Sequence, residues 1–302
     1  MNAKNLDTEN SENKSSDIVS SNRSRQNRVI DKLIQVIENN EYLNNEQIDR
    51  WSSYFDSLRS IKRVKSRNIL RCYIGKDTYI NLTGDDFRSL ADYSKFLNDK
   101  IVDALVGSAC NSYDVNYIQT AFLKLMESDS FTRSNPSPFE KGKDHYLAVY
   151  NASNDHWVLL VFDRPARKLH VIDPLTNGVR RDLGERVLRR CAQIHHGKGS
   201  GARMRRVEEN NDCEVTREFE RMSLNSEWNF VDERWQVGGI PHTLQTDRHN
   251  CGVFCIQFAL QIVHELDVSA GVSDNLVVRA DLDELRRRYV ATILNISDQV
   301  EK

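Results

Sequence analysis

A histidine and an aspartate flank a short turn in this chain, in a pattern typical of a nucleophilic catalytic site. His156 precedes and Asp173 follows the turn Arg164–Arg167, which joins two apolar segments. If these segments are strands that pair antiparallel about the turn, residue 158 faces Asp173 and His156 lies diagonally from it. An imidazole and a carboxylate placed in this way are the base and the orienting group of a triad. A buried, hydrogen-bonded His–Asp pair with a structural role fits the same spacing.

Cys251 is the candidate nucleophile, because it stands just ahead of residues 252–266, the most hydrophobic helical stretch of the chain. The positive end of a helix dipole favours the thiolate form of a cysteine, and Gly252 lets the backbone approach closely. Cys255, one turn further on, is expected to pack in the core. Gln245 precedes Cys251 by six residues and has a side-chain amide that can donate to an oxyanion, together with the Cys251 backbone N–H. Taken alone, Gln245 is an ordinary loop residue.

Hydrophobic periodicity predicts the elements that hold these residues. Three strands are expected at residues 145–150, 156–163 and 168–173, and the middle one is apolar on both faces and therefore central in its sheet. A further strand is expected at 235–240. Residues 82–90 are expected to form a short strand that ends in a turn, with Thr83 or Asp85 as a helix cap. Helices are expected at 29–37, 48–58, 96–109, 115–126, 182–195, 252–266 and 281–294. The pattern predicts an α+β fold with a mixed central sheet of about five strands and the cysteine-bearing helix packed at its centre.

The chain divides into three regions by composition. Residues 1–27 are polar and are expected to be disordered. Residues 28–68 are expected to form a helical segment that ends in the basic linker 59–67, which we interpret as a solvated hinge, with a nuclear address or a phosphate contact as the alternative. Residues 69–296 are expected to form the catalytic domain, in which the polar stretch 197–226 is a surface insertion.

Composition excludes several classes of protein. The 302 residues carry a formal net charge of -2, which rules out a wholesale basic nucleic-acid binder. No run approaches the roughly 18 apolar residues of a membrane-spanning helix, and the N-terminus lacks the apolar core of a secretory signal. We therefore expect an intracellular protein, nuclear or cytoplasmic, or one in a host cell if it is a secreted effector.

The remaining cysteines, histidines and arginines are expected to have structural roles. Six cysteines without a Cys-x-x-Cys pattern indicate reduced thiols, and Cys191, His195, His196 and Cys213 fit no standard zinc pattern, so neither metal nor cofactor is expected. Basic doublets and triplets are expected on exposed helix faces, with a nucleic-acid contact as the weaker alternative; they are Arg180-Arg181, Arg189-Arg190, Arg203–Arg206 and Arg286–Arg288.

The sequence resembles the SUMO-specific and related ubiquitin-like-protein proteases, which are cysteine peptidases of the adenain-like (clan CE), papain-like fold. The matching stretches are Asp86–Leu90 with Phe96–Asp103, the pair His156-Trp157, Asp173 at the family's spacing of 17 residues, Gln245, and Cys251-Gly252; together they cover about residues 70–295. Three features depart from the family pattern. Position 96 is Phe where many members have Trp, Asn250 stands where Asp usually precedes the cysteine, and 78 residues separate Asp173 from Cys251. We attribute that long separation to the insertion.

The resemblance implies a thiol isopeptidase that cleaves after the C-terminal Gly-Gly of a ubiquitin-like modifier. It implies His156, Asp173 and Cys251 as the triad and Gln245 as the oxyanion donor. SUMO is the first choice of partner and substrate, with NEDD8 and ubiquitin behind it, and precursor processing and deconjugation both stay open. Neither a membrane nor a nucleic acid is expected as a partner.

The resemblance also implies how the substrate is recognised. Phe96 and Trp157 would roof a narrow tunnel that admits only glycines, and Asp99 would pair with a basic residue of the modifier. Two alternatives remain: an acetyltransferase that uses the same triad, and an inactive binder of ubiquitin-like proteins.

Overall fold

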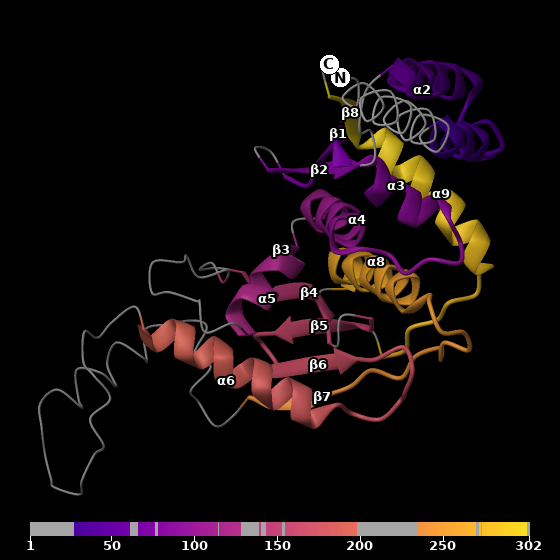
Figure 1. The fold of residues 1–302 in the computed structure, drawn as a ribbon. Helices are drawn as coiled ribbons and strands as arrows, with labels where there is room; N and C mark the ends of the chain where they lie inside the picture. Colours follow the sequence, from indigo (N-terminus) through magenta and orange to yellow (C-terminus); the bar gives the residue numbers. More distant parts are fainter. Residues whose placement is uncertain are drawn as a thin grey trace, which may run out of the picture. The chain divides into compact units, whose positions relative to one another are not determined.

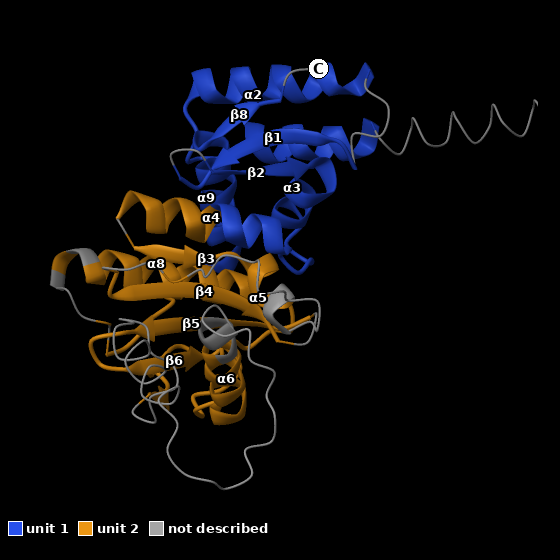
Figure 2. Cartoon of the chain, turned by 90° about the vertical axis from the view of Figure 1, so that its left-hand side faces the viewer, with its two compact units in different colours: residues 1–104, 280–302 blue, residues 105–279 orange. Residues whose placement is uncertain are grey.

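The computed structural model describes residues 27–60, 66–75, 78–113, 115–127, 139, 143–152, 155–197, 235–269, 272 and 274–300. These residues belong to two compact units, unit 1 within residues 1–104 and 280–302 and unit 2 within residues 105–279 (Figure 2). The predicted disordered tail to residue 26, the core of the basic linker and nearly all of the predicted insertion lie outside the described residues. The domain boundaries drawn from the sequence stay predictions.

Unit 2 is built on a five-stranded sheet with the strand order β3-β4-β5-β6-β7 (Figure 1). The strands are β3 (Asn116–Ile118), β4 (His145–Asn151), β5 (Trp157–Asp163), β6 (Lys168–Ile172) and β7 (Gln236–Gly238). The central strands β4, β5 and β6 pair antiparallel, whereas both outer strands pair parallel with their neighbours. The predicted mixed sheet is therefore confirmed, with the all-apolar strand β5 at its centre.

Helices cover both faces of this sheet. Alternate side chains of the strands, among them Tyr146, Leu160 and Val171, form a buried core with α5 (Thr120–Glu127) and α6 (Arg181–Gly197). The intervening side chains of β5 point to the opposite face, because neighbours along a strand alternate between faces. The helix α8 (Cys251–Ser269) packs on β4 and β5. A helix packed on a sheet must be apolar over a wide face, which explains the hydrophobic run predicted there.

Unit 1 contains a smaller sheet that was not predicted from the sequence. Its antiparallel strands are β2 (Tyr79–Thr83), β1 (Asn68–Tyr73) and β8 (Ser297–Gln299), in the order β2-β1-β8. Its helices are residues 27–38, α2 (Asn45–Ser57), α3 (Gly84–Ala91), the start of α4 (Asp99–Ser112) and α9 (Leu282–Asn295), with the 3-10 turn η1 (Leu58–Ser60). The strand β8 brings the end of the chain back to β1, so unit 1 is assembled from both ends of the sequence.

Two predicted elements were wrong in part. Residues 82–90 were expected to form a short strand that ends in a turn, but α3 occupies most of this stretch, because Thr83 accepts from the Asp86 N–H and Asp86 accepts from the Thr83 N–H in a capping box. The predicted cap at Thr83 is confirmed. The expected helix 115–126 begins later, since residues 116–118 pair with β4 as strand β3.

One expected surface arginine is buried. Arg286 in α9 is 0% exposed, and its guanidinium donates to the backbone carbonyls of Ser89 at 3.1 Å and Lys95 at 2.6 Å. These carbonyls follow the last turn of α3 or belong to it, where helix carbonyls lack partners of their own. No helix in the described part of the chain is both long and apolar enough to cross a membrane.

Candidate active site

The structure brings His156 and Asp173 together as predicted. The strands β5 and β6 pair with Leu159 opposite Ile172 and Asp163 opposite Lys168, which is the register centred on the turn between them. His156 immediately precedes β5 and Asp173 immediately follows β6. Their side chains meet at 2.8 Å, between the imidazole Nε2 and the carboxylate Oδ1.

Cys251 completes the cluster from the first residue of α8. Its side chain lies within hydrogen-bonding reach of the His156 ring. Since Nε2 of His156 is engaged by Asp173, Nδ1 is the ring nitrogen left for the sulfur. Cys255 is buried one turn deeper, and burial raises the pKa of its thiol well above the usual value. Of these two cysteines, therefore, only Cys251 is placed for chemistry.

The charged forms of His156 and Asp173 stabilise each other. The hydrogen bond to Asp173, followed by that to Cys251, raises the pKa of His156 to about 9. Burial opposes ionisation of Asp173, but the hydrogen bonds that its carboxylate accepts outweigh burial and lower its pKa. The arrangement therefore favours an imidazolium next to the sulfur and an ionised carboxylate behind it.

Sequence reasoning missed a second cation at the carboxylate. Arg180, expected on an exposed face, donates from Nη1 to Asp173 Oδ2 at 2.7 Å. The Leu175 backbone N–H donates to Oδ1 at 3.0 Å. The only signal in the sequence was an arginine seven residues after Asp173, a spacing that does not by itself indicate contact.

A second histidine lies behind the aspartate. His242 is buried, and its ring nitrogens meet two backbone oxygens, Nδ1 with Ile240 at 2.7 Å and Nε2 with Asp173 at 2.8 Å. Carbonyl oxygens only accept hydrogen bonds, so the ring donates to these oxygens through a nitrogen that carries a proton. His242 thus ties the Asp173 backbone to the strand-like segment before Gln245.

The candidate oxyanion residue Gln245 lies in a loop fixed to the aspartate side of the site. Its backbone N–H donates to the Pro174 carbonyl at 2.8 Å, and its side chain is buried. The side-chain Nε2 donates to the Asp247 backbone oxygen at 2.9 Å and to Asp247 Oδ1 at 3.0 Å, whereas Oε1 has no partner. Both amide protons are therefore used within the loop, and donation to an oxyanion requires that one of these bonds be exchanged.

The loop also accommodates Asn250, where the sequence departs from the family pattern. The Asn250 side chain donates to Asp247 Oδ2 at 3.2 Å, and its backbone N–H donates to Oδ1 at 2.9 Å. Asp247 thus gathers the donors of Gln245, His249 and Asn250, and these bonds hold its pKa below the usual value against the opposing effect of burial. An amide before the nucleophile is compatible with an ordered loop because the carboxylate stands four residues before the cysteine.

The three predicted recognition residues are described within their own units. In unit 1, Phe96 is 44% exposed, and Asp99 opens α4 with its carboxylate accepting from the Lys100 N–H at 3.0 Å. In unit 2, Trp157 opens β5 and is buried. The glycine-selective tunnel and the ion pair with a modifier stay predictions.

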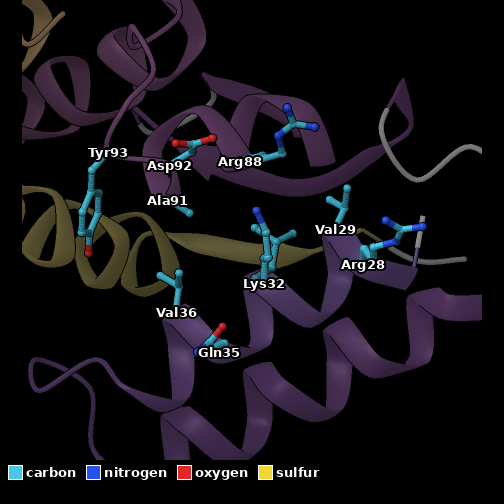
Figure 3. Close-up of a pocket in the computed structure, with 10 residues that line it drawn as sticks. Arg28, Val29, Lys32, Gln35, Val36, Arg88, Ala91, Asp92 and Tyr93 are labelled. Carbon is cyan, nitrogen blue, oxygen red and sulfur yellow. The ribbon is translucent and has the colours of Figure 1, made fainter. Parts of the chain in front are cut away.

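A cavity of about 470 Å³ lies in unit 1. Apolar, polar and charged side chains line it, most of them labelled in Figure 3; they are Arg28, Val29, Lys32, Leu33, Gln35, Val36, Arg88, Ala91, Asp92 and Tyr93. Its lining contains no cysteine, serine, threonine or histidine. Among the described residues, no group of three or more His, Cys, Asp or Glu side chains is arranged to hold a metal ion.

Comparison with known proteins identifies the fold. No protein-family model matches the sequence, and no curated protein does. A solved structure of the SUMO protease Ulp1, with its catalytic cysteine oxidised to a sulfenic acid, is 16% identical with a TM-score of 0.52, over 84% of this chain and 95% of that one. The catalytic domain of the Ulp1-like SUMO protease of Chaetomium thermophilum is 18% identical with a TM-score of 0.48, over 84% and 90%. The protein therefore has the fold of the Ulp1-like SUMO proteases, as the α+β prediction and the resemblance implied.

Proposed function

We propose that the protein is a cysteine-type isopeptidase that cleaves after the C-terminal Gly-Gly of a ubiquitin-like modifier, with SUMO as the first choice. The observation that carries this proposal is the contact of Cys251, His156 and Asp173 at the start of a buried helix. A fold shared with a SUMO protease supports the choice of substrate class.

The geometry supports the following sequence of steps. The Cys251 thiolate, held by the His156 imidazolium, attacks the carbonyl carbon of the terminal glycine. The oxyanion is stabilised by the Cys251 backbone N–H and by Gln245 once its amide is released from Asp247. The imidazolium then protonates the leaving amine of the target lysine, and a thioester remains on Cys251. A water molecule, deprotonated by His156, hydrolyses the thioester and frees the modifier.

Asp173 has no proton to exchange in this scheme. It fixes the ring so that Nδ1 faces the sulfur, and it stabilises the imidazolium. The three groups that donate to its carboxylate, His156, the Leu175 N–H and Arg180, suit a buried side chain that stays ionised throughout.

A hydrolysis assay tests the proposal. SUMO with a fluorogenic amide on its C-terminal glycine should be cleaved by the protein, and Cys251→Ala should abolish turnover while leaving SUMO binding intact. Cys255→Ala is the matched control, since that buried thiol lies one turn away on the same helix. Cleavage by Cys251→Ala at the unaltered rate would refute the assignment.

A further inference from the structure

Arg180 holds the one oxygen of the Asp173 carboxylate that His156 does not use. Oδ1 of Asp173 meets His156 Nε2 at 2.8 Å, and Oδ2 meets Arg180 Nη1 at 2.7 Å. The carboxylate is 2% exposed, whereas the Arg180 side chain is about one-third exposed. The arginine therefore bonds a buried carboxylate from the solvent side.

A contact of this kind fixes both the angle and the charge of a carboxylate. With one oxygen bound on each side, rotation about the Cβ–Cγ bond would break at least one charge-assisted hydrogen bond. A buried carboxylate without partners is costly to ionise, and a neighbouring guanidinium offsets that cost. Arg180 also lies 3.6 Å from Asp182, an exposed side chain that competes only weakly for it.

We propose that Arg180 is a positioning residue of this site, which keeps Asp173 ionised and turned toward His156, so that the imidazolium is held beside the Cys251 sulfur. The inference rests on the proposed function only in that the triad is taken to be catalytic. Arg180 acts through Asp173, and no contact of Arg180 with the sulfur is involved.

Each segment that packs around Asp173 contributes an ionisable group. They are His156 before β5, His242 in the loop after β7, Arg180 before α6, and Cys251 and Cys255 on α8. Of these, Arg180 can be replaced without touching the imidazole, the sulfur or the buried backbone contacts.

The test measures the reactivity of Cys251 without any modifier protein. The full-length protein is treated with iodoacetamide between pH 4 and 9, and alkylation of the Cys251 peptide is followed by mass spectrometry. For Arg180→Ala and Arg180→Gln we expect the acidic midpoint of the rate profile to rise by about one pH unit, because the cation that stabilises the carboxylate is gone. Arg180→Lys keeps the charge, so its acidic midpoint should lie close to that of the wild-type protein. Arg181→Ala is the matched control, since it removes the same charge from the next, exposed position.

Steady-state assays on the fluorogenic SUMO substrate give a second readout. For Arg180→Ala, kcat should fall by about 10- to 100-fold while KM changes little, since a displaced orienting group affects the reaction and not binding. An unshifted alkylation profile in both Arg180→Ala and Arg180→Gln would overturn the proposal, as would an equal shift in Arg181→Ala. If the wild-type profile depends on Arg180 but no ubiquitin-like substrate is cleaved, the role of Arg180 stands and the proposed function fails.

Discussion

We expect the His156 imidazole to control the pH dependence of this site. Its pKa is raised to about 9, first by the hydrogen bond to Asp173 and then by that to Cys251. A raised pKa means that the folded state favours the protonated ring. The resulting stabilisation is complete below the unfolded value of 6.5 and is lost as pH rises through about 9.

The pH dependence of catalysis should reflect the titration of His156. We expect kcat/KM on the SUMO substrate to fall on the alkaline side with an apparent pKa of about 9, because the deprotonated ring can neither hold the thiolate nor protonate the leaving amine. In Asp173→Asn the alkaline limb should move to lower pH, since the largest cause of the raised pKa is removed. A pH–rate profile of both proteins measures this, and an alkaline limb that stays in place in Asp173→Asn would contradict the assigned roles.

The Gln245 amide gives a second prediction at the scale of one residue. Gln245→Ala should lower kcat by about 10²- to 10³-fold with little change in KM, as expected when a single oxyanion donor is lost. Thr246→Ala, at the adjacent exposed position, should leave kcat unchanged. Wild-type kcat in Gln245→Ala would assign the oxyanion to backbone donors alone.

At the scale of elements, the central strands could be predicted because the residues that determine them are close together in the sequence. The turn between β5 and β6 fixes the register, and the apolar run of β5 fixes its central place, so the meeting of His156 and Asp173 followed from the sequence. Residues 84–90 were misassigned because a capping box outweighed their strand-like start. Residues 116–118 were misassigned because their pairing partner, β4, lies about thirty residues away.

The packing of α6 on the sheet depends on a glycine in its first turn. A Cβ at Gly184 would meet the Val237 side chain of β7 and would lie 3.2 Å from Val171 on β6. Although alanine favours helix by about 1 kcal/mol over glycine, the overpacking costs roughly 1–3 kcal/mol. Gly184→Ala should therefore lower the free energy of unfolding, measured by urea denaturation, whereas Glu185→Ala on the exposed face should change it by less than about 0.5 kcal/mol. A more stable Gly184→Ala protein would contradict the described packing.

At the scale of the whole molecule, unit 1 depends on the end of the chain returning to it. The strand β8 pairs with β1, and Arg286 in α9 donates to carbonyls about two hundred residues earlier. Contacts between such distant residues leave no periodic trace in the sequence, which is why the pairing of β8 with β1 and the role of Arg286 were missed. The triad itself was predictable only because its residue types are chemically distinctive.

Arg286→Met should be strongly destabilising. It removes the buried guanidinium that donates to the part-buried carbonyls of Ser89 and Lys95, and we expect a loss of roughly 2–4 kcal/mol in the free energy of unfolding. Arg288→Met is the control, because Arg288 is half exposed and its ion pair with Glu284 is worth at most about 1 kcal/mol. Equal urea midpoints for the two variants would show that Arg286 does not secure unit 1.

Covalent capture on Cys251 is the most direct measurement of the central claim. The protein is incubated with SUMO, NEDD8 and ubiquitin that each carry an electrophile in place of the terminal glycine carboxylate, and the adduct is mapped by mass spectrometry. We predict a single adduct on Cys251, formed fastest with SUMO and absent in Cys251→Ala. No adduct with any of the three probes, or an adduct on a different cysteine, would contradict the account, and acetylation of the protein by acetyl-coenzyme A in that case would favour an acyltransferase.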